Sequence, residues 1–363
     1  MATKKKATSP ARKKKAPAVP AASAMEPQVQ APVENAKPAN WKFIVGLLVV
    51  AFLVTKVWDM RYWQNDGFSF HGFSKTESIT AVFKGAVAER GEGPNNVLGC
   101  LAVAIDPSGS VYYLYGAGTV KKFSPDNKLV AIYDGSKTKE KIAPWSLAPL
   151  PDGTLWASER TSPKLHHFDA KLRLIKTIDT EASGINSLVI DSQGRFIATV
   201  VGGYVQVLDP QGKLLYDVGR KSKKPLVQGT RLTVDDKDNI YVLDQLASSG
   251  NAPEDPIVRS FDKEGKQLNN WTARGLPWNM FSCIAYDPQG YIALNNNGVG
   301  PSQGVQLYSK DGKLMAYVPT ASNGGSLSVL SGLAISSNGD WAADVSPAGR
   351  GCDRLRLPAP EKR

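Results

Sequence analysis

Six segments of the chain repeat one pattern: an alternating apolar run, a tight turn rich in Asp, Pro, Asn and Gly, and a second apolar run. They are LAVAIDPSGSVYYL at 101–114, LAPLPDGTLWAS at 147–158, LVIDSQGRFIAT at 188–199, LTVDDKDNIYVL at 232–243, IAYDPQGYIALN at 284–295 and LAISSNGDWAAD at 333–344. Period-two alternation interrupted by such a turn predicts a β-hairpin. The equivalent turn residues, Gly109, Gly153, Gly194, Asp238, Gly290 and Gly339, are 44, 41, 44, 52 and 49 residues apart.

A second motif, of the form V-x-x-F-D-x-x-G-K-L, lies between successive copies. It reads VKKFSPDNKL at 120–129, LHHFDAKLRL at 165–174, VQVLDPQGKL at 205–214, VRSFDKEGKQL at 258–268 and VQLYSKDGKL at 305–314. Each unit therefore carries four strands, and four short strands per period of this length predict one blade of a β-propeller. We expect an all-β, six-bladed propeller, because a sandwich or an up-and-down barrel does not explain a sixfold repeat.

The sixth unit lacks a fourth strand before the chain ends. It has its hairpin at 333–344 and a weaker third strand around 353–357. Residues 78–86 (SITAVFKGA) form an unassigned strand before the first unit, so we expect this segment to pair with the last blade and close the ring. Closure removes exposed sheet edges. The predicted propeller domain spans residues 78–363.

The chain begins with a basic segment of low apolar content. Residues 1–40 are rich in Ala, Pro and Lys, so we expect a disordered tail. Residues 1–42 carry nine Lys and Arg against Glu26 and Glu34, which gives +7 of the net charge of +11. The remainder is nearly balanced, so charge does not indicate a nucleic-acid-binding propeller. The lysines are read as a topology signal, although anionic lipid or nucleic acid could also bind them.

Residues 41–58 predict a single transmembrane anchor. Twelve uninterrupted apolar residues, FIVGLLVVAFLV at 43–54, are flanked by Lys42 and Lys56 and by Trp41 and Trp58, as at membrane interfaces. A cleaved signal peptide is the alternative, but the long segment before it and the lack of a small-x-small site after it favour the anchor. The anchor would contact lipid. The positive-inside rule puts the tail in the cytoplasm and the propeller outside it, in the periplasm of a bacterium. Residues 59–77 are interpreted as a membrane-proximal stalk.

The repeat resembles that of the NHL family of six-bladed propellers over residues 78–357. The resemblance implies a rigid ring used mostly to bind proteins, nucleic acids or small ligands. A weaker similarity concerns the gluconolactonase and senescence-marker-like propellers, whose E-G-P motif holds a divalent cation together with Asn and Asp. Glu92-Gly93-Pro94 matches that triplet and Asn186 matches loosely a second ligand. Eleven residues separate Pro94 from Asp106, and no third ligand is evident, so we favour an ordinary blade-entry loop.

Candidate functional residues follow from their positions at the inner strand ends. The channel-mouth candidates are Glu159, Arg160, Asn186, Arg231, Asp244, Asn296 and Asp344. For Asp244 and Asp344 the alternative is a carboxylate that accepts backbone hydrogen bonds. Trp278 and Phe281 could anchor a protein partner, with packing between blades as the alternative. Three cysteines and three histidines are too few for a disulfide framework or a His-rich metal site.

The sequence thus leaves two functions open. The favoured one is a non-catalytic, membrane-anchored extracytoplasmic propeller that binds or scaffolds a protein, such as an accessory subunit of a membrane complex, and needs no cofactor. The alternative is a metal-dependent lactonase or esterase that holds a divalent cation such as calcium through Glu92 and Asn186.

Overall fold

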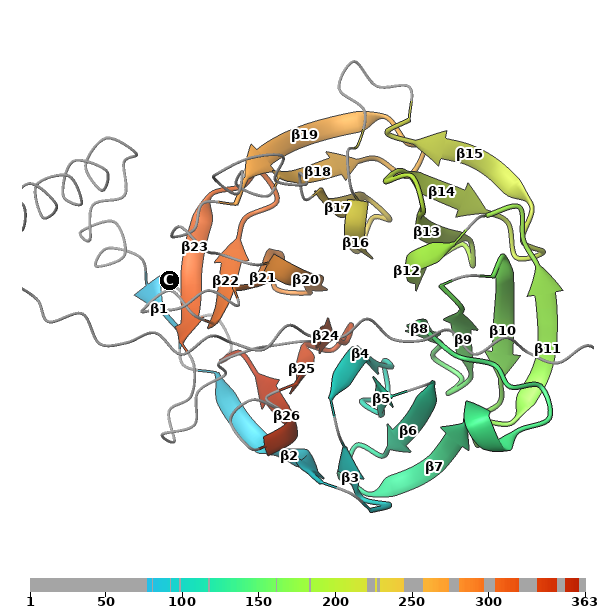
Figure 1. Ribbon diagram of the computed structural model, residues 1–363. Helices are drawn as coiled ribbons and strands as arrows, with labels where there is room; N and C mark the ends of the chain where they lie inside the picture. The colour runs from blue at the N-terminus through green and yellow to red at the C-terminus, as the bar shows by residue number, and fades with distance from the viewer. Residues whose placement is uncertain are drawn as a thin grey trace, which may run out of the picture. The chain divides into compact units, whose positions relative to one another are not determined.

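Six sheets stand around a central axis in the computed structural model of the protein (Figure 1). The structure describes residues 77–79, 81–91, 93–97, 99–116, 118–160, 162–182, 184–220, 226, 229–244, 257–273, 281–296, 304–319, 332–344 and 350–358. The predicted tail and anchor and the stalk up to residue 76 lie outside these ranges. No helix among the described residues is long and apolar enough to cross a membrane.

The first four blades each consist of four consecutive antiparallel strands, with the first strand innermost. Blade one contains β4 (Cys100–Ile105), β5 (Val111–Tyr115), β6 (Thr119–Phe123) and β7 (Leu129–Asp134), and blade two contains β8 (Ser146–Pro149), β9 (Leu155–Ser158), β10 (Lys164–Phe168) and β11 (Leu174–Asp179). Blade three contains β12 (Ile185–Ile190), β13 (Phe196–Val200), β14 (Val205–Leu208) and β15 (Leu214–Val218), and blade four contains β16 (Gly229–Val234), β17 (Ile240–Asp244), β18 (Ile257–Phe261) and β19 (Gln267–Thr272). The sixfold repeat predicted this arrangement correctly.

The last two blades each gain strands from the N-terminal side of the domain. Blade five contains β20 (Phe281–Asp287), β21 (Tyr291–Asn296), β22 (Gly304–Tyr308) and β23 (Leu314–Pro319), with β1 (Glu77–Ser78) beside β23. Blade six contains β24 (Leu333–Ile335), β25 (Asp340–Asp344) and β26 (Arg350–Arg356), completed by β2 (Val82–Arg90) and β3 (Asn96–Val97). The ring therefore closes on the last blade, as predicted.

The closing segment differs from the prediction in one respect: 78–86 is not a single strand. Glu77 and Ser78 pair in parallel with Ala316 and Tyr317 of blade five, and the N–H of Ile79 donates to the carbonyl oxygen of Tyr317 at 2.9 Å. The antiparallel strand that completes blade six then begins at Val82. A two-residue strand has no periodicity of its own, so only the tertiary pairing reveals that the chain also covers the edge of blade five.

The tight turns predicted from the repeat all have the same backbone conformation. Gly109, Gly153, Gly194, Asp238, Gly290 and Gly339 have φ between 63° and 97°. This left-handed region favours glycine. Asp238 is the exception to glycine, and its carboxylate is used: it accepts hydrogen bonds from the N–H and hydroxyl of Ser192 in blade three, at 2.9 and 2.6 Å.

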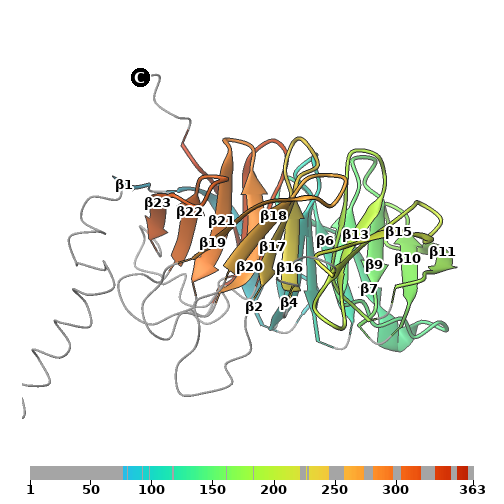
Figure 2. The same ribbon diagram turned by 90° about the horizontal axis from the view of Figure 1, so that it is seen from above.

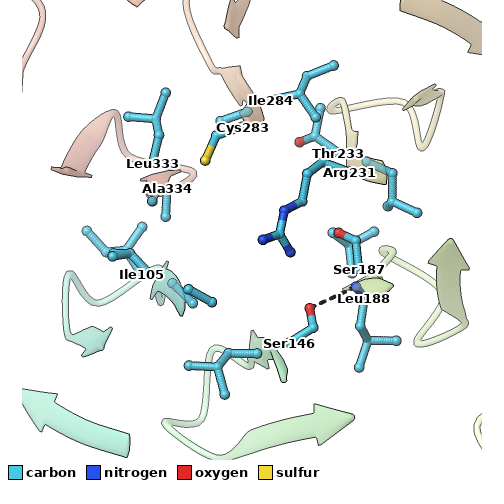
Figure 3. Close-up of a pocket in the computed structure, with 18 of the residues that line it drawn as sticks. Ile105, Ser146, Ser187, Leu188, Arg231, Thr233, Cys283, Ile284, Leu333 and Ala334 are labelled. Carbon is cyan, nitrogen blue, oxygen red and sulfur yellow. Dashed lines mark hydrogen bonds between the residues drawn. The ribbon is translucent and has the colours of Figure 1, made fainter. Parts of the chain in front are cut away.

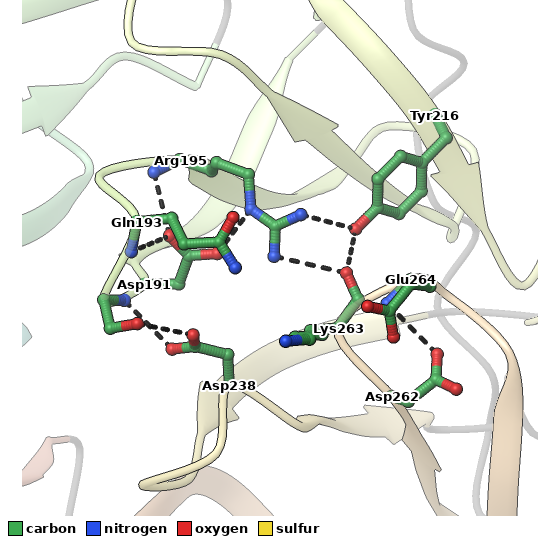
Figure 4. Close-up of polar contacts among 9 residues, drawn as sticks. Asp191, Gln193, Arg195, Tyr216, Asp238, Asp262, Lys263 and Glu264 are labelled. Carbon is green, nitrogen blue, oxygen red and sulfur yellow. Dashed lines mark hydrogen bonds and ion pairs between the residues drawn. The ribbon is translucent and has the colours of Figure 1, made fainter.

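Polar contacts join neighbouring blades on the face where these turns lie. Between blades three and four, the Arg195 guanidinium donates to the Asp191 carboxylate at 2.6 Å and to the carbonyl oxygen of Lys263 at 3.2 Å, and the Tyr216 hydroxyl donates to the same carbonyl (Figure 4). Figure 2 shows the sheets side by side, with their strands running between the two faces of the ring. The turn face is therefore tied together by side chains as well as by backbone.

The hydrophobic core consists of six clusters, one between each pair of adjacent blades. For example, Trp341 of blade six is fully buried among Ala293, Val305 and Leu307 of blade five. Its indole N–H donates to Asp287 of blade five at 2.8 Å. Because each blade buries both faces against neighbours, stability depends on the closed ring.

Candidate functional site: the central channel

The first strand of every blade lines the central channel. The innermost turn residue of each blade accepts the N–H of the left-handed residue three positions later; these residues are Asp106, Leu150, Asp191, Asp235, Asp287 and Ser336. Counting four residues back from each gives one structurally equivalent position: Ala102, Ser146, Ser187, Arg231, Cys283 and Gly332. All six line one cavity of about 180 Å³ on the axis of the ring. Five of them are small, so the sixth, an arginine, has room to extend inward.

Arg231 is the single charged residue among the described residues that line this cavity. Its guanidinium reaches into the open middle of the channel (Figure 3). One of its nitrogens, Nη1, donates to the carbonyl oxygen of Asn186 in blade three at 3.2 Å. The walls around it are largely aliphatic and include Leu188, Ile284 and Leu333. The site thus combines a positive charge with apolar walls.

Neutral polar groups complete the lining. Burial raises the pKa of the Cys283 thiol, and the positive charge of Arg231 offsets only part of that rise. The Ser146 hydroxyl oxygen accepts the N–H of Leu188 at 3.0 Å, and the Thr233 hydroxyl oxygen accepts the N–H of Tyr286 at 3.2 Å. Because a hydroxyl is both donor and acceptor, Ser146 and Thr233 each keep an O–H to donate.

The predicted acidic candidates form contacts within the fold. Asp244 forms an ion pair with Arg259 at 2.9 Å, and both side chains are buried. The carboxylate of Asp344, also buried, accepts the hydroxyl of Tyr113 at 2.7 Å. These contacts match the structural alternative that the sequence left open for the two carboxylates.

Glu159 is likewise held by neighbours in blade two and the segment before it. It accepts the N–H of Ala143 at 2.9 Å and lies 3.2 Å from Nε2 of His166. Burial lowers the pKa of His166, and Glu159 opposes that shift. Arg160 is exposed and stacks over the ring of Trp145, with 4.7 Å between its guanidinium carbon and the ring centre.

The remaining candidates are only partly accessible to description. Asn296 and Phe281 were assigned to different sites, but they are register partners at the start of blade five. Asn186 supplies the carbonyl oxygen that Arg231 binds. Glu92 and Trp278 lie outside the described residues, so the proposed convergence of Glu92 with Asn186 stays a prediction.

The charge of the channel opposes a cation site at this point. A divalent cation needs oxygen ligands, several of them carboxylates, whereas the cavity presents a guanidinium. Within the described ranges, no three His, Cys, Asp or Glu residues lie close enough together to hold a metal ion.

Sequence reasoning missed the small residues of the channel layer. Ser146, Ser187 and Cys283 carry no motif of their own. The signal that would have found them is the fixed four-residue offset from the turn, which requires the turns of all six blades to be aligned first.

Comparison with known proteins shows the fold. No family model matches the sequence, and no curated protein matches it. A solved structure described as RRP9 WD40 repeats is 11% identical with a TM-score of 0.51, over 78% of this chain and 99% of that one. The structure of U3-55K is 13% identical with a TM-score of 0.50, over 78% and 100% of the two chains. A streptogramin B lyase is 11% identical with a TM-score of 0.50, over 70% and 78%. At these identities the similarity is one of architecture: the chain shares the β-propeller fold.

Proposed function

We propose that this chain is a membrane-anchored, extracytoplasmic β-propeller that binds a protein partner and does not itself catalyse a reaction. Residues 41–58 would hold it in the lipid bilayer, with the basic tail in the cytoplasm, and in a bacterium the propeller would stand in the periplasm. The repeat would belong to the NHL type. The proposal rests on the propeller fold, on the sequence of the first 58 residues and on one feature of the outer strands.

That feature is a set of exposed apolar side chains, here called the rim residues, at one equivalent position of blades one to five. They are Val130, Ile175, Leu215, Leu268 and Met315, with exposed fractions of 38% to 53%. Each is the extra residue of a β-bulge between the third and fourth strands. Blade six has Lys84 at its bulge. A repeated, outward-facing apolar residue favours a contact surface over chance exposure.

The outer edges of the blades differ in the same region. β1 covers the edge of blade five and β3 extends that of blade six. In the described part of the chain, no further strand lies beside β7, β11, β15 or β19, the outer strands of blades one to four. Such an edge presents unpaired backbone groups, to which an extended partner segment can add as a strand. We therefore place the partner on the rim of blades one to four.

Site-specific crosslinking in native membranes tests this assignment. A photoreactive residue at Ile175 or Leu215 of the full chain should capture a discrete partner, whereas the same residue at Lys237, exposed in a turn of blade four, should not. Ile175→Ser combined with Leu215→Ser should abolish the captured species without lowering the thermal stability of the chain. Capture from Lys237 and not from the rim would contradict the proposal.

A further inference from the structure

We infer that the central channel binds a small organic anion, a monocarboxylate with a short apolar body, whose carboxylate meets the guanidinium of Arg231. This site uses the inner strands, so it is separate from the rim contact proposed above. Its ligand would lie on the axis of the ring, among the first strands of all six blades.

The first argument is the charge of Arg231. Removing a guanidinium from water is costly unless an opposite charge or hydrogen-bond acceptors compensate it. The described lining contains no Asp or Glu, and the described hydrogen bond of the guanidinium goes to a neutral carbonyl, that of Asn186. A guanidinium has five N–H donors in a planar fork that fits a carboxylate in a bidentate manner. A bound carboxylate would supply the missing negative charge.

The second argument is space. Arg231 has small residues at the five equivalent positions of the other blades, which leaves a cavity of about 180 Å³. A protein cavity of about 150 Å³ is known to hold a benzene molecule. The channel therefore has room for an acid the size of butyrate or benzoate beside the guanidinium.

The third argument is the lining. Leu188, Ile284 and Leu333 would contact the apolar body of the ligand, while Ser146 and Thr233 each retain an O–H that can donate to an anion. The Cys283 thiol, whose pKa is raised by burial, does not add a negative charge that would repel the ligand.

The same features exclude other ligand classes. An amino acid would bring an ammonium group that meets no acidic residue in the described lining. A phosphate or dicarboxylate would bring a second negative charge with no second cation to meet it, and would lose more hydration on entry. The combination of one cation and apolar walls selects a monoanion.

The test measures binding of benzoate and of its neutral analogue benzamide to the full chain in detergent, by calorimetry and by the shift of Tm. We expect benzoate to bind and benzamide to bind at least about tenfold more weakly, because only benzoate gains charge-assisted hydrogen bonds. Arg231→Gln should weaken benzoate binding about 10- to 100-fold and leave benzamide binding unchanged. Arg220→Gln, which removes an exposed arginine paired with Asp217, is the matched control and should bind like the native chain.

A second variant separates space from charge. Ser187→Leu fills the channel while it retains Arg231, so it should also lose benzoate binding, with a melting temperature close to that of the native chain. Equal affinity of the native chain for benzoate and benzamide, unchanged benzoate binding in Arg231→Gln, or no binding of benzoate or butyrate to the native chain at 10 mM would each overturn the inference. The comparison of acid with amide on the native chain needs no variant to fold.

Discussion

The turn face and the central channel treat charge in opposite ways. At the turns between blades three and four, the Asp191 carboxylate is surrounded by donors: two backbone N–H groups at 3.0 and 2.9 Å and the Arg195 guanidinium (Figure 4). In the channel, Arg231 projects among aliphatic walls without an acidic neighbour in the described lining (Figure 3). The difference indicates that the repeated turn charges serve the fold, whereas the charge that departs from the repeat serves a ligand.

The largest effect should come from removing a buried turn carboxylate. Asp235 accepts the N–H groups of Lys237 and Asn239 at 2.9 Å each and the Nζ of Lys310 in blade five at 2.7 Å. Asp235→Ala orphans these donors, so we expect the free energy of unfolding to fall by about 3 kcal/mol. Asp209→Ala removes the exposed equivalent in an outer turn, and there we expect at most about 1 kcal/mol. Urea unfolding of both variants checks the contrast, which equal losses would contradict.

Two equivalent turn carboxylates should respond to pH in opposite directions. Burial would raise the pKa of Asp235, but the Lys310 ammonium and Asn239 outweigh it and lower that pKa. Asp235 therefore stabilises the fold above the unfolded pKa of about 4, and this contribution is lost as pH falls through the lower folded pKa. For Asp287, burial dominates and raises the pKa, so its contribution is present at low pH and lost as pH rises through the folded pKa.

The pair Asp235→Asn and Asp287→Asn measures this difference. As pH falls from 7 to 3, the stability advantage of the native chain should shrink relative to Asp235→Asn and grow relative to Asp287→Asn, by about 1 to 2 kcal/mol in each case. Thermal unfolding across this pH range gives both curves. Parallel curves for the two variants would show that the turns are not distinguished by their buried partners.

The left-handed turn residue Asp238 should show that the carboxylate outweighs backbone strain. Glycine at this position relieves the cost of φ at 63°, but it removes the acceptor of two hydrogen bonds from Ser192. We expect Asp238→Gly to lose about 1 kcal/mol net. Gly194→Ala, at the equivalent turn of blade three, is the control for strain alone. A stabilised Asp238→Gly would mean that the contact between blades contributes little.

The channel should show the opposite sign. Replacing Arg231 by Met removes a cation from apolar surroundings at similar volume, so we expect Arg231→Met to raise the free energy of unfolding by about 1 kcal/mol in the absence of ligand. Gains of this kind, made at the expense of binding, are common at functional sites. A loss of stability would instead assign Arg231 to the fold, through its bond to Asn186.

The rim should show the smallest effect on stability. The side chain of Ile175 is more than half exposed. Ile175→Ser should change the free energy of unfolding by no more than about 0.5 kcal/mol. Val205→Ser, at a fully buried position of blade three, is the contrasting variant and should cost several times more. A large loss in Ile175→Ser would show that the rim residue packs within the blade.

The comparison also marks how far sequence reasoning reaches. The hairpins at 101–114 and 232–243 carry their own turn chemistry and apolar alternation, so their strands, their turns and the number of blades followed from local pattern. The roles of Asp244 and Asp344 did not, because their partners come from other strands. Arg259 lies 15 residues after Asp244, and Tyr113 is 231 positions away from Asp344. A strand end with an Asp looks the same in sequence whether it faces a ligand or an arginine.

By itself, the sequence determined a closed ring of six four-stranded blades, because period, turn and alternation are encoded within each unit. Only the tertiary structure decided which residues share the channel. The residues at 102, 146, 187, 231, 283 and 332 meet because six separate strands stand in the same register around one axis. Only the tertiary structure, likewise, decided that the segment before β2 adds to blade five. Local hydrogen bonding fixes the blade, and long-range register fixes the site.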